Sequence, residues 1–281
     1  MNAERKIKDL IGSHRPFRSI LVKPRVFKAL TVAGSDPSGG AGIQADLKTF
    51  SSFDVYGSAV ITALTAQNTT GVDGIFTVEP DFIRRQLTMV LDDLGPQPLK
   101  TGMIPTTAAI EVIVAAVEQY KLKQLVVDPV LIATSGDKLV VETTLEALRR
   151  LMGHALLVTP NLSEAAQLSG LTLTSFDDMK DAALQIYQTG VRNVLIKGGH
   201  LLDDATDLFF DGKEFIFLKE KRIPVGDTHG TGCTYSAAIT AGLAKGMPLL
   251  DAIVNAKIYI TRALKFHLDV GKGSKVLNFR V

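Results

Sequence analysis

Residues 108–130 read AAIEVIVAAVEQYKLKQLVVDPV and contain two kinds of apolar pattern. The first, at 108–120, has the three- and four-residue spacing of an amphipathic helix. The second, QLVVDPV (124–130), is a short apolar run that stops at a proline, which is typical of a buried strand. Another short strand, LKTGM (99–103), precedes the helix. Strand, helix and strand in this order predict a parallel βαβ unit.

The same alternation continues on both sides of this unit. In the helix predicted at 81–91, Phe82 and the residues from Leu87 to Leu91 are expected to supply the apolar side. Two apolar runs around Asp211-Gly212 predict a hairpin within 207–218. The other predicted strands lie at 28–34, 58–67, 155–161 and 193–199, and the other predicted helices lie around 43–50, at 163–170, 176–190, from 231 onward, and at about 249–267.

This alternation predicts an α/β fold, with a mostly parallel sheet covered by helices on both faces. No long linker or internal repeat interrupts it, so we expect one domain at 28–281. Residues 1–27 carry seven basic and two acidic side chains, a net charge of +5, and are expected to form a loosely ordered extension.

Composition narrows the class of protein. The chain has 281 residues, of which 46% are apolar, and a net charge of +2. Its single cysteine excludes an internal disulfide and favours the reducing cytoplasm. No apolar run reaches the roughly 18 to 20 residues of a membrane span. We therefore expect no membrane partner. The chain body also has no basic stripe with interleaved aromatic residues, so we expect no nucleic-acid partner.

Unusual motifs follow the predicted strands. Ligands of such sheets bind beyond the carboxyl ends of the strands, so these motifs predict one functional crevice. The motifs are GSDPSGGAG after the first strand, AQN after the second, and TGM, DPV, TPNLSE and KGGH after later ones.

Gly230-Thr231-Gly232-Cys233 comes directly before a helical pattern. Glycines let successive backbone amides turn toward one point, and a helix N-terminus adds partial positive charge. The segment therefore predicts an anion site for a phosphoryl group in transfer, although an ordinary glycine-rich helix start has the same pattern.

Cys233 is expected to have a lowered pKa, because a helix N-terminus stabilises a thiolate. It could accept a proton from a substrate hydroxyl, or act as a covalent nucleophile. A cysteine hydrolase therefore stays open, although no base partner can be assigned; His229 is expected only to shape the turn.

Three charged residues lie at or just after strand ends. Lys197 follows a buried-type strand and can reach a phosphate. Asp128 and Glu164 are hard oxygen ligands suited to Mg²⁺, often through water. For Glu164, capping of a helix N-terminus is an equally good explanation. No P-loop, protein-kinase DFG or GxGxxG signature is present, so a phosphotransferase here must belong to another lineage.

With these motifs assembled, the chain resembles the hydroxymethylpyrimidine/phosphomethylpyrimidine kinases of thiamin biosynthesis, in the ribokinase-like superfamily. The resemblance covers about 28–267 and implies a ribokinase-like three-layer sandwich. The segments that carry it are AGSDPSGGAGIQADLKTF (33–50), ITALTAQNT (61–69), KTGM (100–103), VVDPV (126–130), TPNLSEA (159–165), KGGH (197–200) and HGTGCT (229–234).

The resemblance implies two successive phosphorylations from ATP, with Mg²⁺, of 4-amino-5-hydroxymethyl-2-methylpyrimidine and then of its monophosphate. It also implies a homodimer. By position, it assigns pyrimidine binding to Asp46 and Gln67, with Gly34, Ala41, Met103 and Val130 lining that pocket. It assigns ATP contacts to Asn161, Lys197, Thr231 and Gly232, and an anion hole to 230–232. Metal binding falls to Asp128 and Glu164, and Cys233 takes the position that faces the substrate hydroxyl.

Gln67 and Asp46 also suit a pyrimidine chemically. A carboxamide can pair with an aminopyrimidine edge, which offers a donor beside an acceptor, and a carboxylate suits an amine. Pyridoxal has no such edge, yet pyridoxal kinase is the nearest alternative, because these enzymes share AGSDxSGGAG and GxGCT. A non-catalytic vitamin-binding protein is a more distant one. Thr134 in ATSG (133–136) replaces a lysine that the family commonly has, which puts a phosphate contact in doubt.

Overall fold

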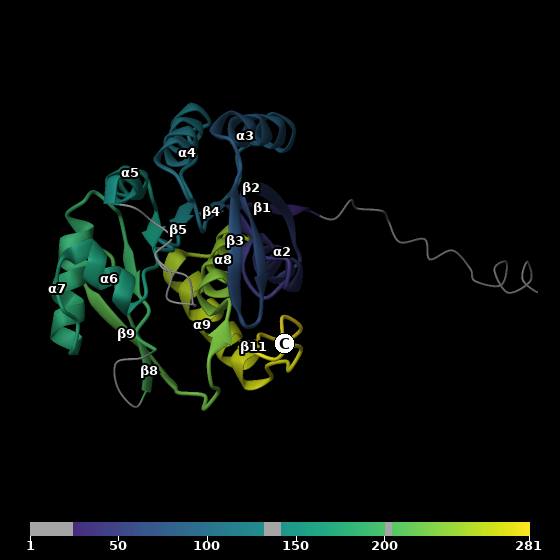
Figure 1. Ribbon diagram of the computed structural model, residues 1–281. Coiled ribbons are helices and arrows are strands. Elements are labelled where there is room, and N and C mark those ends of the chain that lie inside the picture. The colour runs from purple at the N-terminus through teal and green to yellow at the C-terminus, as the bar shows by residue number, and fades with distance from the viewer. Residues whose placement is uncertain (1–24, 132–141, 200–203) are drawn as a thin grey trace, which may run out of the picture.

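A computed structural model describes residues 25–131, 142–199 and 204–281 of the chain (Figure 1). Thr134 and most of the N-terminal extension lie outside the described residues. The strands are β1 (Phe27–Ser35), β2 (Val55–Asn68), β3 (Gly71–Thr77), β4 (Leu99–Thr101), β5 (Leu125–Val127), β6 (Leu157–Val158), β7 (Val194–Ile196), β8 (Asp204–Phe210), β9 (Phe215–Lys221), β10 (Thr228–His229) and β11 (Lys275–Val276). The helices are α2 (Gly42–Ser52), α3 (Pro80–Leu94), α4 (Thr107–Gln119), α5 (Glu142–Gly153), α6 (Leu162–Ser169), α7 (Phe176–Tyr187), α8 (Thr231–Ala244) and α9 (Leu249–Lys265).

The main sheet is mostly parallel, as the sequence predicted. Its strand order is β3-β2-β1-β4-β5-β6-β7-β8-β9. The six strands from β2 to β7 in this order pair in parallel. Antiparallel strands form both edges: β3 pairs with β2, and β8 with β9 forms the predicted hairpin. All parallel strands therefore point their carboxyl ends to one edge of the sheet.

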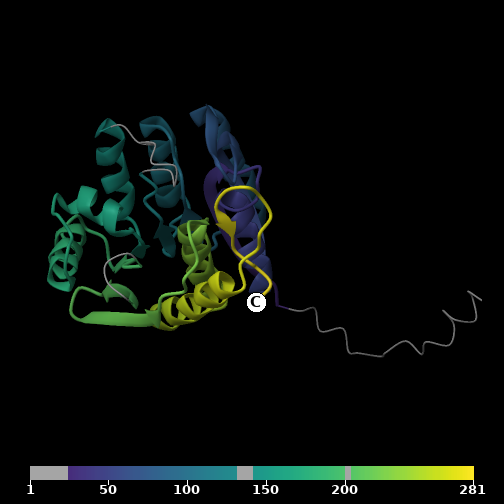
Figure 2. The ribbon, with the colours of Figure 1, turned by 60° about the horizontal axis from the view of Figure 1, so that its bottom comes forward.

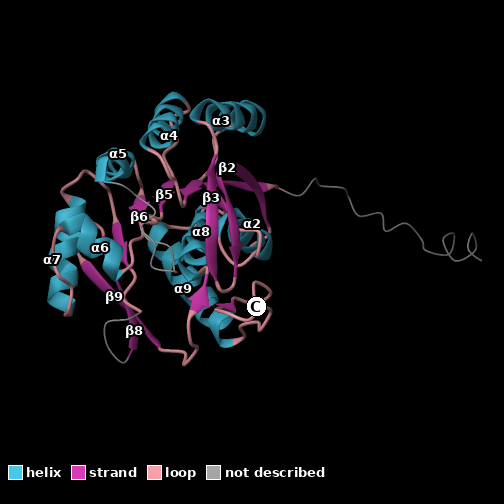
Figure 3. Ribbon diagram, viewed as in Figure 1, coloured by secondary structure: helices cyan, strands magenta, loops and turns pink. Residues whose placement is uncertain are grey.

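Helices cover both faces of the sheet (Figures 2 and 3). One buried cluster packs residues of α3 to α7 against the sheet, and others pack residues of α2, α8 and α9 against the opposite face. The strand β5 shows the alternation directly, since Leu125 and Val127 join the first cluster while Val126 joins the second. The short parallel strands read as continuous apolar runs because both of their faces are buried.

Local signals explain where several helices begin and end. Thr106 caps α4 by accepting a hydrogen bond from the N–H of Ala109. Ser175 and Asp178 form a reciprocal capping box at the start of α7. Gly170 ends α6 in the left-handed conformation, with φ of 75°. Among the described residues, no helix has the length and apolar composition needed to cross a membrane.

Three expectations about the fold were wrong or incomplete. Phe82 is 51% exposed, because α3 turns Ile83, Leu87 and Leu91 toward the core instead. The helix α5 was not predicted, although Ala147, Leu148, Leu151 and Met152 have helical spacing and are buried. The edge strand β3 was not predicted either, because it has two glycines and exposed polar positions in place of a clear alternating pattern.

Candidate active site

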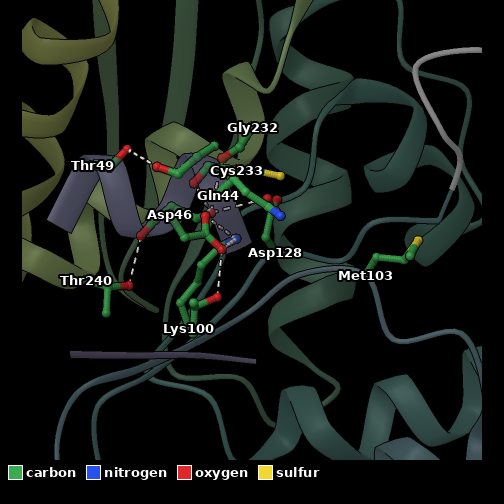
Figure 4. Close-up of polar contacts among 12 residues, drawn as sticks. Gln44, Asp46, Thr49, Lys100, Met103, Asp128, Gly232, Cys233 and Thr240 are labelled. Atoms are coloured by element: carbon green, nitrogen blue, oxygen red, sulfur yellow. Dashed lines mark hydrogen bonds and ion pairs between the residues drawn. The ribbon is translucent and has the colours of Figure 1, made fainter. Parts of the chain in front are cut away.

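The carboxyl ends of the parallel strands meet the N-terminus of α8, and charged and polar side chains from several elements gather there. Figure 4 shows Asp46, Lys100, Asp128 and Cys233 gathered at this place, with Gly232 beside them. Asp46 comes from α2, Lys100 from β4, Asp128 from the end of β5, and the last two residues from α8.

The backbone at 230–233 forms what we call the amide nest. Gly230 has left-handed φ and ψ of 81° and 10°, and Thr231 begins the helix. This change of conformation makes successive N–H groups converge. Within the described part of the chain, the N–H groups of Thr231, Gly232 and Cys233 have no acceptor. Gly230 must be glycine here, because a Cβ would lie 1.8 Å from the carbonyl oxygen of Gly40.

Lys197 and Asp128 lie beside the nest. The Nζ atom of Lys197 is 2.8 Å from Asp128 Oδ1, and a Cβ on Gly232 would lie 3.0 Å from that Nζ atom. Burial would lower the pKa of Lys197, but the charges of Asp128 and Glu164 raise it above its usual value. The lysine is therefore a fixed positive charge next to three free amides, as an anion site requires.

Besides its ion pair with Lys197, the Asp128 carboxylate accepts hydrogen bonds from two hydroxyl groups. Thr159 and Ser236 each donate a hydrogen bond to its carboxylate over 3.2 Å. Burial would raise the pKa of Asp128, but Lys197 and Lys100 lower it. The carboxylate stays ionised at the mouth of the site.

Glu164 caps α6, as the alternative explanation proposed. Its carboxylate accepts from the backbone N–H of Asn161 over 2.7 Å, while Asn161 Oδ1 accepts from the N–H of Glu164 over 2.9 Å. Burial and the charge of Asp128 raise the pKa of Glu164 to about 7, although Lys197 opposes this. The described residues contain no group of three or more His, Cys, Asp and Glu that could hold a metal ion. Mg²⁺ commonly uses one or two carboxylates with water and phosphate, so Asp128 and Glu164 are the oxygen ligands that such an ion would take from the protein here.

Asp46 does not lie where a substrate amine could reach it. Its side chain is fully buried, and both carboxylate oxygens lie 2.8 Å from the Nζ atom of Lys100. Thr31 Oγ1 donates a third hydrogen bond over 2.6 Å. The expected contact between Asp46 and the pyrimidine is therefore replaced by a buried ion pair, because a charge in the core must be paired there.

Cys233 also differs from expectation. Its side chain is partly exposed, yet burial raises the pKa of the thiol to about 11, and the charges of Asp46 and Asp128 act in the same direction. Lys100 and a hydrogen bond from the Gly42 amide oppose the rise. The predicted lowering of the pKa was wrong, because desolvation and two carboxylates outweigh the helix N-terminus. A neutral thiol also removes support from the cysteine hydrolase.

Gln67 lines an open depression of about 720 Å³, with Pro37, Ala66, Asn68, Thr70, Gly71, Val72 and Asp73. Its side-chain amide lies 3.0 Å from His229 Nε2 and 3.0 Å from Thr65 Oγ1. His229 Nε2 lies 2.9 Å from Asp36 Oδ2. The contact between Gln67 and His229 thus joins the AQN segment to the 229–233 loop.

The remaining predicted pocket residues lie on the same edge of the sheet. Gly34 and Met103 are neighbours, since a Cβ on Gly34 would lie 2.4 Å from Met103 Cε. The N–H of Ala41 donates to Asp36 over 2.8 Å, and the N–H of Val130 donates to the carbonyl of Asp128 over 2.9 Å.

Sequence reasoning missed Lys100, Asp36 and the full part played by His229. Lys100 had a usable signal, because a lysine inside an apolar strand needs a carboxylate partner. Asp36 accepts five hydrogen bonds, from Ser38, Gly40, Ala41 and His229, and so fixes the loop that begins α2.

Comparison with known proteins agrees with this geometry. Residues 36–278 match the family model for phosphomethylpyrimidine kinase. The chain is 43% identical to a hydroxymethylpyrimidine/phosphomethylpyrimidine kinase of Bacillus subtilis (strain 168), over 88% of this chain and 93% of that protein. It is 48% identical to a probable chloroplastic thiamine biosynthetic bifunctional enzyme of Oryza sativa subsp. japonica, over 87% of this chain but only 45% of that longer protein. It likewise spans about half, 51%, of the thiamine biosynthesis bifunctional protein of Geobacter sulfurreducens.

Solved structures give the same result. A pyridoxal kinase of Bacillus subtilis, solved as an ADP complex, has a TM-score of 0.84 at 40% identity, covering 90% of this chain and 97% of that one. A phosphomethylpyrimidine kinase of Clostridium difficile 630 has a TM-score of 0.77 at 42% identity, covering 85% of this chain and 100% of that one. These neighbours share the ribokinase-like fold that the motifs implied. The chain belongs to the phosphomethylpyrimidine kinase family.

Proposed function

We propose that this protein transfers a phosphoryl group from ATP to 4-amino-5-hydroxymethyl-2-methylpyrimidine and then to the resulting monophosphate. Family membership supports the pyrimidine alcohol, and the ADP complex of the Bacillus subtilis pyridoxal kinase supports a nucleotide as the second substrate. The observation that carries the proposal is the amide nest. Three N–H groups without an acceptor and the charged Lys197 lie side by side, and together they would stabilise a phosphoryl group.

Electrostatics and positioning supply most of the catalysis. The N–H groups of Thr231 and Gly232 and the ammonium of Lys197 stabilise negative charge on the transferring group. Asp128 holds the charged Lys197 in place through a 2.8 Å ion pair. Mg²⁺, held through Asp128 and Glu164, would screen the phosphate charges of ATP. Asn161 borders Lys197 through a parallel bridge, which supports assigning it to the nucleotide side.

Cys233 faces the reaction as a neutral thiol. With a pKa of about 11, it is protonated at neutral pH and does not serve as a ready base. Phosphoryl transfer with a loose transition state needs little help from a base. We therefore assign Cys233 to orienting the substrate hydroxyl, and Cys233→Ala should lower turnover while leaving pyrimidine binding intact.

Gln67 gives the proposed substrate preference. Its amide can offer one acceptor and one donor to the aminopyrimidine edge, whereas pyridoxal has no edge with the matching donor and acceptor. Pyridoxal kinase is the second candidate, because close structural neighbours have that activity.

The deciding experiment compares kcat/KM on the pyrimidine and on pyridoxal, for the wild type and Gln67→Leu. We expect the wild type to prefer the pyrimidine, and Gln67→Leu to weaken pyrimidine binding by about 1–3 kcal/mol. Gln185→Leu, on the exposed side of α7, is the matched control and should change neither rate. A wild type that prefers pyridoxal, or an unaltered affinity in Gln67→Leu, would contradict the assignment.

We further propose that the enzyme is a cytoplasmic homodimer joined through the β2–β3 edge. Leu64 and Phe76 are directly opposite each other in the sheet and are 46% and 70% exposed. Exposed apolar pairs on an edge strand are a common site of association. Light scattering should give twice the chain mass for the wild type and a smaller mass for Phe76→Lys. A monomeric wild type would contradict this proposal.

A further inference from the structure

The surroundings of Gln67 determine which way its amide group faces. One end of the amide lies against Thr65 Oγ1 and the other against His229 Nε2, each over 3.0 Å. Turning a carboxamide by 180° exchanges its oxygen and nitrogen with almost no change in shape. The donors and acceptors of the neighbouring groups therefore decide the orientation.

Asp36 fixes the proton on His229. Burial would raise the pKa of Asp36, but hydrogen bonds from His229, Ser38 and the backbone lower it to about 2. The carboxylate is thus ionised at neutral pH and can only accept hydrogen bonds. Since His229 Nε2 lies 2.9 Å from Asp36 Oδ2, that nitrogen must carry a hydrogen and donate it.

A nitrogen that carries a hydrogen cannot accept one from an NH₂ group. The amide oxygen of Gln67 must therefore face His229, and the NH₂ group must face Thr65. Thr65 suits this arrangement, because its hydroxyl donates to the carbonyl of Ser35 over 2.9 Å and keeps lone pairs that can accept. The one hydrogen on His229 Nε2 is then shared between Asp36 Oδ2 and the Gln67 oxygen, and no two donors face each other.

This orientation leaves one lone pair and one N–H of Gln67 without a protein partner. Gln67 lines the open depression, where a ligand could use them. We propose that His229 is a positioning residue that sets substrate specificity, by holding the Gln67 amide in the single orientation that pairs with a 4-aminopyrimidine edge. The inference rests on the proposed function. Glycine at position 40 leaves room for the His229 ring, since a Cβ there would lie only 2.6 Å from the ring.

A substrate with the opposite edge provides the test. The 4-oxo analogue of the pyrimidine alcohol presents an acceptor oxygen beside an N–H donor, so it pairs only with the reversed amide. The wild type should favour the 4-amino over the 4-oxo substrate in kcat/KM by at least about 100-fold, because the held amide leaves groups of the analogue unpaired.

His229→Phe keeps a ring but removes the donor, so the Gln67 amide can turn to suit either substrate. In this variant, the ratio of kcat/KM on the 4-amino substrate to kcat/KM on the 4-oxo substrate should fall by at least about tenfold. His229→Gln places an amide N–H near the position of Nε2 and should restore most of the ratio. His154→Phe, a partly exposed histidine at the end of α5, is the control and should keep the wild-type ratio. An unchanged ratio in a folded His229→Phe overturns the proposal.

Nitrogen NMR of the histidine rings tests the orientation without using activity, and covers the case in which His229→Phe does not fold. The His229 signals are assigned by their loss in His229→Gln. A proton-bearing Nε2 at pH 7.5 supports the proposal, and an Nε2 without a proton overturns it. If neither pyrimidine is phosphorylated, the proposed function fails while this measurement still decides the orientation.

Discussion

The ammonium of Lys100 lies 2.8 Å from both carboxylate oxygens of Asp46, and neither side chain has any exposed surface. The pair joins β4 to α2 beneath the thiol of Cys233 (Figure 4). Two charges withdrawn from water depend on each other, so the loss of either one leaves an uncompensated charge in the core.

Lys100→Met and Asp46→Asn should each lower the free energy of unfolding by about 3–5 kcal/mol. The double variant should lose much less than the sum, because no lone charge remains. Urea unfolding of the four proteins in the cycle measures this. Lys180→Met breaks an exposed pair with Asp177 and should cost no more than about 1 kcal/mol. Additive losses in the double variant would show that the two residues are not coupled.

Cys233 should react slowly with alkylating reagents at neutral pH. A pKa of about 11, against 9.0 for an ordinary thiol, leaves about 100-fold less thiolate. The rate of iodoacetamide labelling should keep rising as the pH increases from 8 to 10, and the urea-unfolded chain should react at the ordinary rate. Since the chain has one cysteine, mass spectrometry reads the reaction directly. A plateau below pH 8 would contradict the burial argument.

Gly232→Ala should impair the anion site without unfolding the protein. The added Cβ would lie 3.0 Å from Lys197 Nζ and 3.6 Å from Asp128 Oδ2, so the ammonium must shift by a few tenths of an ångström and the methyl group crowds the nest. Loss of one such electrostatic contact costs about 100- to 1000-fold in kcat. Gly226→Ala, where a Cβ meets nothing within 4 Å, is the control. Steady-state kinetics measure kcat, and a thermal melt of each variant checks that it is folded. An unchanged kcat in folded Gly232→Ala would refute the role of the nest.

Glu164 should make stability depend on pH. Its folded pKa of about 7 lies above the ordinary value of 4.5, so its contribution to stability is fully present below pH 4.5 and is lost as pH rises through 7. Glu164→Gln imitates the protonated form and keeps an acceptor for the Asn161 amide. Urea midpoints measured from pH 4.5 to 8 should therefore fall more for the wild type than for Glu164→Gln. Parallel curves would mean that Glu164 does not titrate in this range.

The sequence was sufficient for those features that depend on local pattern. Buried strands such as 125–127, the glycine-rich start of α8, and the placement of Lys197 and Asp128 at strand ends could all be predicted. The pairing of Lys100 with Asp46, 54 residues away, and of His229 with Asp36, 193 residues away, required the folded chain. The pKa of Cys233 could not be predicted, because it depends on desolvation and on carboxylates from other elements.

Product analysis of the purified protein with Mg-ATP and 4-amino-5-hydroxymethyl-2-methylpyrimidine tests the central claim most directly. Mass spectrometry over a time course should show the monophosphate first and the diphosphate after it, with ADP formed in step. ATP left unconsumed with this pyrimidine, while pyridoxal is phosphorylated under the same conditions, would contradict the account.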